Sequence, residues 1–264
     1  MWSLGVITPH AAAGSEAEWP LMVPRQIVTR IARIPAPGAT AAAPGTPPTS
    51  PAGLRTLADP AAMNDAAASF GGPGSVDAIG LASTSMGYVI GGAAESALLQ
   101  KLSLRCNVPV DGASAAAVTA LRVMDIERVE LVHPPWFDDE MNELGNRYFQ
   151  NEGFNVIASM SAALPSDPQR IEADEVITWI SHHVNDDAQA VFIGGNGFRV
   201  ATAIERLEHH VGRPVLASNQ VLLWSLLGKL RVRSEVCGYG SLFQQSPPST
   251  GTQPRPSDAA RRRT

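Results

Sequence analysis

Short apolar runs alternate along this chain with longer segments in which apolar residues recur every three or four positions. The short runs, bounded by small residues, are typical of buried strands, and the longer periodic segments are typical of helices. Expected strands lie at residues 4–9, 26–34, 76–82, 107–110, 128–133, 154–159, 188–193 and 213–217. Expected helices lie at residues 54–70, 93–105, 113–124, 137–151, 166–183, 198–211 and 220–230.

The regular alternation of strands and helices predicts parallel sheets with helices on both faces. Residues 76–92 run from a strand through a small-residue turn into a helix, and residues 188–199 repeat this order about 110 residues later, which is the size of one domain. We therefore predict an α/β fold of two similar doubly wound parallel-sheet (Rossmann-like) domains, with pseudo-two-fold symmetry and an interdomain cleft.

The expected domain boundaries follow from this repeat. The first domain comprises residues 1–111 plus 215–243, and the second comprises residues 112–214. Residues 35–51 are mostly Pro, Ala, Gly, Thr and Ser, which predicts a flexible loop. Residues 244–264 are polar and proline-rich and end near three arginines, which predicts a disordered tail.

Composition narrows the function classes. The chain has 264 residues and a formal net charge of −5, so its acidic balance gives no support for a nucleic-acid partner. Its two cysteines, Cys106 and Cys237, have no metal-ligand spacing, which favours a reducing compartment without disulfides or zinc. No apolar run approaches the ~20 residues that span a bilayer, and no signal peptide is visible. We expect a cytoplasmic protein with no membrane contact, no metal and no cofactor.

Two small-residue turns are the candidate ligand site. Ser83, Thr84 and Ser85 follow an expected strand at the sheet edge where ligands bind in open α/β folds. Small hydroxyls and free backbone N–H groups before a helix suit a carboxylate or phosphate, although a serine-rich helix cap is an equally good interpretation. The second turn, residues 194–197, lacks the Lys and Ser/Thr of a P-loop and the spacing of a dinucleotide fingerprint.

Two histidines are candidates for acid–base chemistry. His10 and His133 each follow an expected strand at the same edge, and histidine titrates near neutral pH. The alternative is that each bonds the backbone of its loop. Trp136 and Phe137 are candidates for the wall of an apolar pocket, although packing in the core is the usual role of aromatic residues.

Several motifs, in the same order along the chain, resemble those of the Asp/Glu racemase superfamily. More narrowly, the chain resembles the branch that holds maleate cis-trans isomerase and arylmalonate decarboxylase. The resemblance covers about residues 4–243, with the proline-rich loop as an insertion. The motifs are Gly5-Val6-Ile7-Thr8-Pro9, Glu16-Ala17-Glu18, Ala82-Ser83-Thr84-Ser85, His133-Pro134-Pro135 with Asn142, Gly195-Asn196-Gly197-Phe198-Arg199, Gly212-Arg213-Pro214-Val215 and Ser218-Asn219-Gln220.

The resemblance implies a pseudo-symmetric two-domain enzyme that needs no metal or organic cofactor. In that family two cysteines, one from each half, face each other across a small carboxylic acid. The racemases use them to exchange a proton at the α-carbon, and in the isomerase one adds to the double bond. The decarboxylase keeps only the second cysteine, which protonates an enediolate held by hydroxyls and backbone N–H groups.

The reactive positions of the family differ in this chain. The resemblance places the first cysteine at Ser83 and the second at Gly195, or at Gly194 if the register shifts by one. Neither Cys106 nor Cys237 lies at a matching position. The family's asparagine after the first strand falls near residue 12, and its substrate-binding tyrosine falls on residue 136 or 137.

What the resemblance retains is an anion cradle. It consists of the Pro9 loop, Thr84, Ser85 and the backbone N–H groups around Asn196 and Gly197. A serine hydroxyl is a weak nucleophile without an adjacent base, and glycine has no reactive group. Two-base racemisation is therefore disfavoured.

Two functions stay open at this point. One is a cofactor-independent isomerase or lyase of this type, acting on a small mono- or dicarboxylic acid, with Ser83, His10 and His133 as catalytic candidates. The other is a carboxylate-binding protein that has lost both catalytic thiols. The expected partner is a small carboxylic acid in either case, and the sequence leaves open whether the chain forms homo-oligomers.

Overall fold

The computed structural model describes residues 1–9, 13–34, 51, 54–55, 58–72, 74–232 and 235–248. His10, nearly all of the loop expected at residues 35–51, and the tail from residue 249 onward lie outside these described residues. Within the part expected to be tail, the backbone carbonyl of Gln245 accepts a hydrogen bond from Trp224 Nε1 at 3.0 Å.

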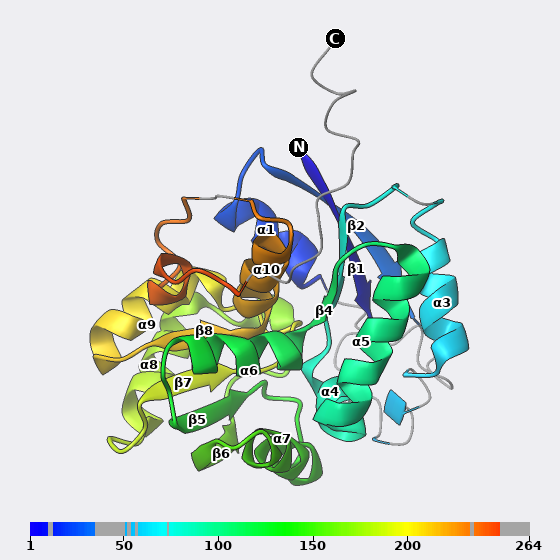
Figure 1. Cartoon of the computed structure of the whole chain (residues 1–264). Coiled ribbons are helices and arrows are strands. Elements are labelled where there is room, and N and C mark those ends of the chain that lie inside the picture. The colour runs from blue at the N-terminus through cyan, green and yellow to red at the C-terminus, as the bar shows by residue number, and fades with distance from the viewer. Residues whose placement is uncertain are drawn as a thin grey trace.

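Two four-stranded sheets form the framework, and both have the same strand order (Figure 1). The first has the order β2-β1-β3-β4, and the second has the order β6-β5-β7-β8. Every pair within them is parallel, as predicted. The strands are β1 (Trp2–Thr8), β2 (Ile27–Arg33), β3 (Ala78–Leu81), β4 (Val110–Gly112), β5 (Arg128–His133), β6 (Asn155–Ser161), β7 (Ala190–Ile193) and β8 (Val215–Ala217).

Helices follow most strands and cover the sheets. They are α1 (Ser15–Met22), α3 (Pro60–Ala68), α4 (Thr84–Ile90), α5 (Gly92–Cys106), α6 (Ala113–Val123), α7 (Asp139–Asn151), α8 (Ala173–His183), α9 (Ile204–Val211) and α10 (Ser218–Lys229). Short 3-10 turns lie at Pro168–Arg170, Ala201–Ala203 and Ser241–Gln244. The predicted α/β fold with two parallel sheets is confirmed.

Several helices differ from the sequence prediction: α3 and α9 begin six residues later than expected, and three further differences have a clear local cause. A separate helix, α4, precedes α5, because Gly91 has a φ of +81° and interrupts the helical path. The helix expected at 166–183 begins at Ala173, where Glu172 and Glu175 form a capping box. Helix α1 was not predicted, because its apolar residues have little helical periodicity and Pro20 lies inside it.

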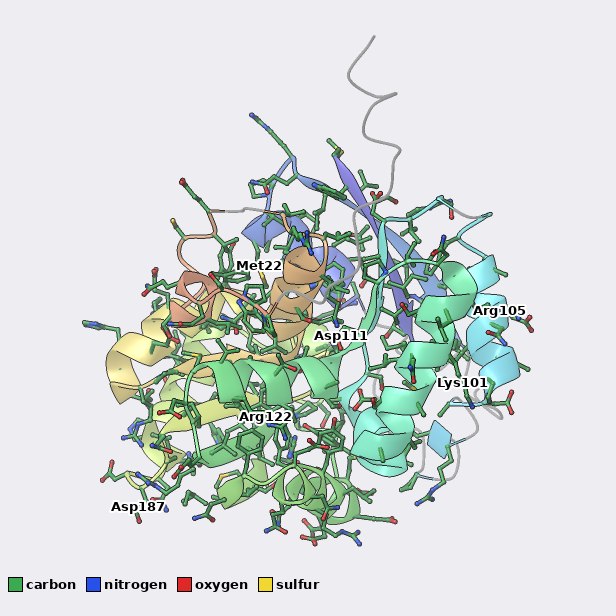
Figure 2. All side chains as sticks on the ribbon, viewed as in Figure 1. Met22, Lys101, Arg105, Asp111, Arg122 and Asp187 are labelled. Atoms are coloured by element: carbon green, nitrogen blue, oxygen red, sulfur yellow. The ribbon has the colours of Figure 1, made fainter. Side chains whose placement is uncertain are left out.

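Many charged side chains lie at the surface, whereas the central strands and α10 are buried. Lys101 and Arg105 lie exposed on α5 (Figure 2). By contrast, every residue of β3 and β7 is buried. Burial on both faces is typical of parallel strands covered by helices.

Helix α10 lies at the junction of the two halves (Figure 1). It follows β8 of the second sheet but contacts α1, β3 and β4 of the first sheet, and also α6. Its residues from Ser218 to Leu227 are all buried. Asp111 at β4 accepts a short hydrogen bond from Ser225 and pairs with Lys229 Nζ at 3.4 Å, which fixes the helix to the first sheet.

One strand bears on the predicted domain boundary. Residues 215–217 form β8 and pair with β7 in the second sheet. We expected residues 215–243 to join the first domain, so a boundary that respects the sheets would fall after residue 217. The division itself stays a prediction.

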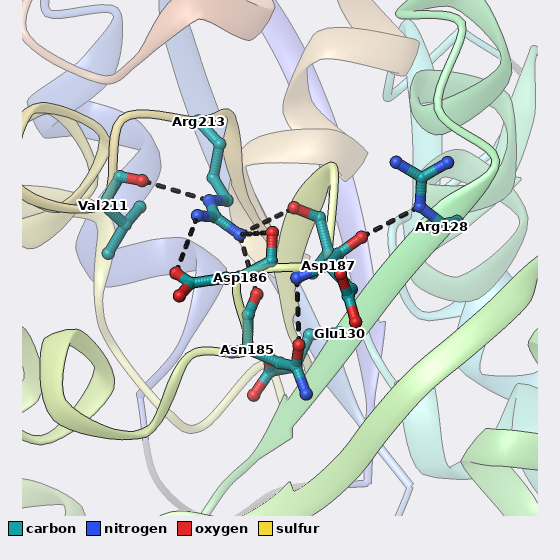
Figure 3. A network of polar contacts seen from close by, with 8 residues as sticks. Arg128, Glu130, Asn185, Asp186, Asp187, Val211 and Arg213 are labelled. Atoms are coloured by element: carbon teal, nitrogen blue, oxygen red, sulfur yellow. Dashed lines mark hydrogen bonds and ion pairs between the residues drawn. The ribbon is translucent and has the colours of Figure 1, made fainter.

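The amino edge of the second sheet is closed by Arg213 (Figure 3). Its Nη1 donates to the carbonyl oxygens of Asn185 and Ala188 at 2.7 Å each, and its Nε donates to that of Val211 at 3.0 Å. The Asn185 N–H in turn donates to Glu130 Oε2 at 2.6 Å. These contacts hold the loop before β7 at the edge opposite the candidate site.

Candidate functional site

The candidate site lies where the strand order reverses in each sheet. In the first sheet the chain moves outward from β1 to β2 and then returns to β3 on the other side of β1, and β5, β6 and β7 repeat this. Crevices at the carboxyl ends of such strands are the usual ligand sites of open α/β sheets. The two reversal points bring together the segments after Thr8, Leu81, His133 and Ile193.

The first turn, which we define as Ser83–Ser85, is a buried set of hydroxyl side chains. Ser83 Oγ caps α4 by accepting the Met86 N–H at 3.2 Å, and it lies 3.2 Å from Ser85 Oγ. The helix-cap interpretation therefore describes Ser83 correctly. Pro9 lies at the same sheet edge, directly after Thr8, whose Oγ1 donates to the carbonyl of Ala82 at 3.1 Å.

The second turn, Gly194–Gly197, contacts the first directly. The N–H of Gly195 donates to Thr84 Oγ1 at 2.9 Å, although the two residues are 111 positions apart. Gly195 has a φ of +84°, a conformation that strains residues with a side chain. A cysteine at the Gly195 position would therefore be strained, whereas Gly194 has no positive φ.

His133 is fully buried behind the second turn. Its ring stacks on Phe137 and meets the edge of Tyr88, each with ring centroids 5.5 Å apart. Neither ring nitrogen has a hydrogen-bond partner in the described part of the chain. Burial lowers the pKa of His133 to about 3, so the imidazole is neutral near pH 7. The sequence had suggested a group that titrates near neutral pH.

Close packing around His133 explains the glycine at position 194. A Cβ on Gly194 would lie 2.8 Å from His133 Nδ1 and 3.1 Å from the Tyr88 hydroxyl. On the other side, a Cβ on Gly145 of α7 would lie 3.0 Å from His133 Nε2. The imidazole thus occupies the space that a side chain at Gly194 would need.

Tyr88 is a site residue that the sequence prediction missed. It lies on α4 one turn after Thr84 and is buried. The Thr84 side chain approaches its hydroxyl and tends to lower the Tyr88 pKa, but not in hydrogen-bond geometry, and the hydroxyl has no other partner in the described chain. Burial, with a smaller effect of the Glu95 charge, raises the Tyr88 pKa far above its ordinary value, so the phenol stays protonated.

Of the two predicted wall residues, Trp136 lies beside the second turn and Phe137 lies deeper. A Cβ on Gly197 would be 3.4 Å from the Trp136 ring, and Trp136 meets the edge of Phe198 with ring centroids 6.2 Å apart. Phe137 is buried and stacks on His133. The predicted residues on β5 and its loop therefore surround the second turn.

The buried side-chain amide of Asn219 holds the second turn in place through hydrogen bonds to Asn196. Asn219 Oδ1 accepts hydrogen bonds from Ser15 Oγ at 2.8 Å and Asn196 Nδ2 at 2.7 Å. Asn219 Nδ2 donates to Glu18 Oε2 at 2.7 Å and to the backbone oxygen of Asn196 at 2.9 Å. Glu18 Oε1 accepts the Ala201 N–H at 2.7 Å. We call Ser15, Glu18, Asn196 and Asn219 the amide hub.

Burial dominates the electrostatics of the amide hub. It raises the pKa of Glu18 to about 7, against the opposing effects of its hydrogen bonds from Ala201 and Asn219. Ser15, Glu18 and Asn219 were not predicted as site residues. The signal for Glu18 and Asn219 lay in two family motifs, Glu16-Ala17-Glu18 and Ser218-Asn219-Gln220, whereas Ser15 lies in neither.

The two cysteines lie away from this site. Cys106 ends α5 and lines a cavity of about 130 Å³ with Arg105 and Ser75, near the amino ends of β3 and β4. Cys237 is exposed, and both thiols are free.

A second cavity, of about 470 Å³, lies along α8 beside Trp179. No group of three or more His, Cys, Asp or Glu among the described residues could hold a metal ion.

None of the described helices is both long enough and apolar enough to cross a membrane. This was also the expectation from the hydropathy of the sequence.

Comparison with known proteins places this geometry in context. A model of the arylmalonate decarboxylase family matches residues 51–243. A search among curated proteins found no match.

Solved structures agree in fold. Unliganded arylmalonate decarboxylase matches with a TM-score of 0.71 and 18% identity, over 92% of this chain and 99% of the other. A cysteine-to-alanine variant of the Pseudomonas putida maleate isomerase, with maleate, matches with a TM-score of 0.75 and 19% identity, over 93% of this chain and 98% of the other. A cysteine-to-serine variant of the Nocardia farcinica maleate cis-trans isomerase carries a covalently bound succinylcysteine intermediate. It matches with a TM-score of 0.76 and 19% identity, over 92% of this chain and 98% of the other.

Proposed function

The chain belongs to the arylmalonate decarboxylase family, and on that premise we propose that it converts a small mono- or dicarboxylic acid at the junction of its two turns. The reaction would be an isomerisation or decarboxylation that uses no metal or organic cofactor. Its location would be the cytoplasm, where its two free cysteines would stay reduced.

The observation that carries this proposal is the hydrogen bond from the Gly195 N–H to Thr84 Oγ1, 2.9 Å long. It joins the turn after β3 to the turn after β7. The hydroxyls of Ser83, Ser85 and Tyr88 belong to the same buried region. Fixed donors in a region that excludes water stabilise a carboxylate, and stabilise a developing enediolate more strongly than water would.

Decarboxylation would use this arrangement as follows. The bond between the α-carbon and one carboxylate carbon breaks, and carbon dioxide leaves. The electron pair stays as an enediolate on the remaining carboxylate, held by the hydroxyls of the first turn. A proton then adds to the α-carbon.

The group that would donate this proton to the α-carbon has three candidates, namely Ser83, His10 and His133. Ser83 Oγ bonds Ser85 and the Met86 N–H, so among the described residues it has no adjacent base. The neutral imidazole of His133 lies next to Gly194 and Tyr88, but neither of its nitrogens has a hydrogen-bond partner among the described residues, so His133 could act only on a ligand group that reaches it.

A binding function without chemistry is the second candidate. Ser83 and Gly195, or Gly194, stand where the resemblance expects thiols, and both cysteines lie elsewhere. This arrangement favours a protein that keeps the carboxylate cradle and has lost the reaction.

One experiment separates the two. The full chain is incubated with maleate, phenylmalonate and single enantiomers of hydroxy and amino acids, while NMR follows turnover and thermal denaturation follows binding. Turnover that is lost in Thr84→Val and kept in Glu130→Gln, a change at the opposite sheet edge, supports the enzyme. Stabilisation without turnover supports the binding protein. Neither turnover nor stabilisation by any of these acids contradicts both.

A further inference from the structure

Glu18 fixes which atoms donate and which accept in the hydrogen bonds of the amide hub. This carboxylate is 4% exposed, and when ionised it can only accept hydrogen bonds. It accepts the Ala201 N–H with one oxygen and Asn219 Nδ2 with the other, each at 2.7 Å. Above the raised Glu18 pKa of about 7, where the carboxylate is ionised and the binding tests below are made, the amide of Asn219 must therefore turn its NH₂ group toward Glu18.

The orientation of Asn219 then sets that of Asn196. With its NH₂ group facing Glu18, Asn219 presents Oδ1 to Ser15 Oγ at 2.8 Å and to Asn196 Nδ2 at 2.7 Å. Its second NH₂ hydrogen goes to the backbone oxygen of Asn196 at 2.9 Å. Trp19 Nε1 donates to the backbone oxygen of Asn219 at 2.8 Å and fixes the start of α10. Every donor and acceptor atom of the Asn219 amide is thus used.

One acceptor atom at the end of this series of hydrogen bonds has no partner among the described residues. Asn196 is 1% exposed, and its Oδ1 has no hydrogen-bond partner among the described residues. Buried polar atoms in folded proteins are nearly always paired, so each exception needs an explanation. The Oδ1 atom belongs to the second turn, directly after Gly195, whose N–H bonds Thr84.

Other unpaired atoms gather at the same turn. Eight buried side-chain atoms have no partner in the described chain, and four of them belong to Asn196, Tyr88 and His133. Tyr88 and His133 are the two residues against which Gly194 packs. The Tyr88 hydroxyl and His133 Nδ1 pack directly against Gly194, and His133 Nε2 faces Gly145, so Asn196 Oδ1 is the unpaired atom that belongs to the second turn itself.

We propose that Asn196 determines specificity: its amide oxygen, oriented by Glu18 through Asn219, accepts a hydrogen bond from a hydroxyl or amino group of the bound acid. The ligand class is then a carboxylic acid that also carries an O–H or N–H donor. The inference rests on the proposed function, since it assumes that the acid binds at the two turns.

Three matched acids test the acceptor. The three acids differ at carbon 2. Malate has a hydroxyl group there, which can donate a hydrogen bond, 2-methoxysuccinate has an ether oxygen without a hydrogen, and succinate has no oxygen at this carbon. We expect calorimetry on the wild-type chain to give a dissociation constant for malate about tenfold lower than for the other two. Equal affinities for the three acids would overturn the acceptor role and leave the carboxylate site standing. No binding of any of them would overturn this inference, and turnover or stabilisation by the wider set of acids then decides the proposed function separately.

A variant of Glu18 tests the relay. In Glu18→Gln the side-chain oxygen still accepts the Ala201 N–H, and the new NH₂ group faces Asn219. The Asn219 amide must then turn over, and Asn196 turns over with it to present its NH₂ group. A hydroxyl oxygen accepts a hydrogen bond as well as a methoxy oxygen does, so we expect the preference to be lost, with malate and 2-methoxysuccinate bound about equally. A merely structural role of Glu18 would weaken all three acids alike.

The double variant Glu18→Gln/Asn219→Asp supplies the rescue at unchanged net charge. The carboxylate that replaces the Asn219 amide can only accept hydrogen bonds. It would accept them from the new glutamine amide, from Ser15 Oγ and from Asn196 Nδ2, so the oxygen of Asn196 is presented again. The backbone oxygen of Asn196 loses its donor in this variant, so we expect weaker binding of all three acids but a restored preference for malate.

Glu130→Gln is the matched control for these variants, because it removes another buried carboxylate at the opposite sheet edge. It should keep the wild-type preference for malate. An unchanged malate preference in Glu18→Gln, or a double variant that does not regain the malate preference, would overturn the relay. If Glu18→Gln does not fold, the wild-type comparison of the three acids still decides the acceptor role.

Discussion

The two turns occupy equivalent places in the two sheets but are built from different chemistry. The first turn follows β3 and presents the side-chain oxygens of Ser83, Thr84 and Ser85. The second follows β7 and has glycines at three of its four positions, so it presents backbone groups and the packed rings around them. One turn therefore supplies hydroxyls and the other supplies backbone N–H groups, close packing and the Asn196 amide, and neither forms a complete carboxylate site alone.

The difference also explains how the two turns tolerate change. The hydroxyls of the first turn are bonded within α4 or to the second turn. The glycines of the second turn have no space beside them, because Pro134, His133 and Tyr88 lie against Gly194 and Gly195. We expect substitutions to cost stability in the second turn and ligand affinity in the first.

The largest effect is expected for Gly195→Ala. The new Cβ would lie 2.7 Å from Pro134 Cγ, in a backbone with a φ of +84°. Backbone strain and overpacking together should lower the free energy of unfolding by roughly 3 kcal/mol, measured by urea denaturation. Gly197→Ala is the control, since its Cβ would be in ordinary contact with Trp136 at 3.4 Å. Equal stability of the two variants would contradict the close packing and backbone strain at Gly195.

The next effect concerns pH and His133. Its pKa of about 3 in the folded chain lies below its ordinary value of 6.5, so the unfolded chain binds the proton first as pH falls. The stability that the neutral ring contributes is present above pH 6.5 and is lost between pH 6.5 and 3. At pH 5 the loss should be about 2 kcal/mol.

His133→Leu isolates this contribution. Glu18 and Glu95 have raised pKa values of about 7 and act in the opposite direction, but both remain in the variant and cancel in the comparison. Denaturation at pH 7 and pH 5 should show that wild type loses more stability than the variant. Parallel losses in the two proteins would show that the ring is hydrated or paired.

A smaller effect is expected when the contact between the turns is removed. Thr84→Val leaves the buried Gly195 N–H without its acceptor, which should cost about 1–2 kcal/mol. Thr84→Ser keeps the hydroxyl and should retain most of that stability. Hydrogen exchange of the Gly195 amide should accelerate in the valine variant alone, and equal protection in both variants would contradict the contact.

The smallest effect on stability is expected for Ser85→Ala. Its hydroxyl has a single 3.2 Å contact with Ser83 Oγ, so its removal should cost less than about 1 kcal/mol. Ser83→Ala should cost more, because it also removes the cap of α4. Carboxylate affinity should nonetheless fall several-fold in Ser85→Ala, measured by calorimetry. Unchanged affinity would take Ser85 out of the cradle.

The sheets could be predicted from the sequence because buried parallel strands leave a local signal. The runs that became β3 and β7 are short, apolar and followed by small residues, which suffices to find them and the ligand edge beyond them. Helix α4 was missed, since it is only seven residues long and ends at Gly91, whose backbone angle separates it from α5.

The site was predictable only in outline. The first and second turns could be recognised, but the partners of the second turn come from distant segments. Glu18 reaches Ala201 across 183 positions and Asn219 across 201, which no local pattern reveals. The protonation of His133 likewise depends on burial by Tyr88 and Phe137, so its ordinary pKa was a poor guide.

Helix α10 has a consequence for how the chain folds as it is synthesised. It is made after both sheets, yet it covers β3 and β4 and is fixed to Asp111 through Lys229. The amino-terminal sheet therefore leaves the ribosome without part of its cover and keeps apolar surface exposed until α10 emerges. Domains commonly fold in order during synthesis, but here the first half can complete its core only when the second half is already present.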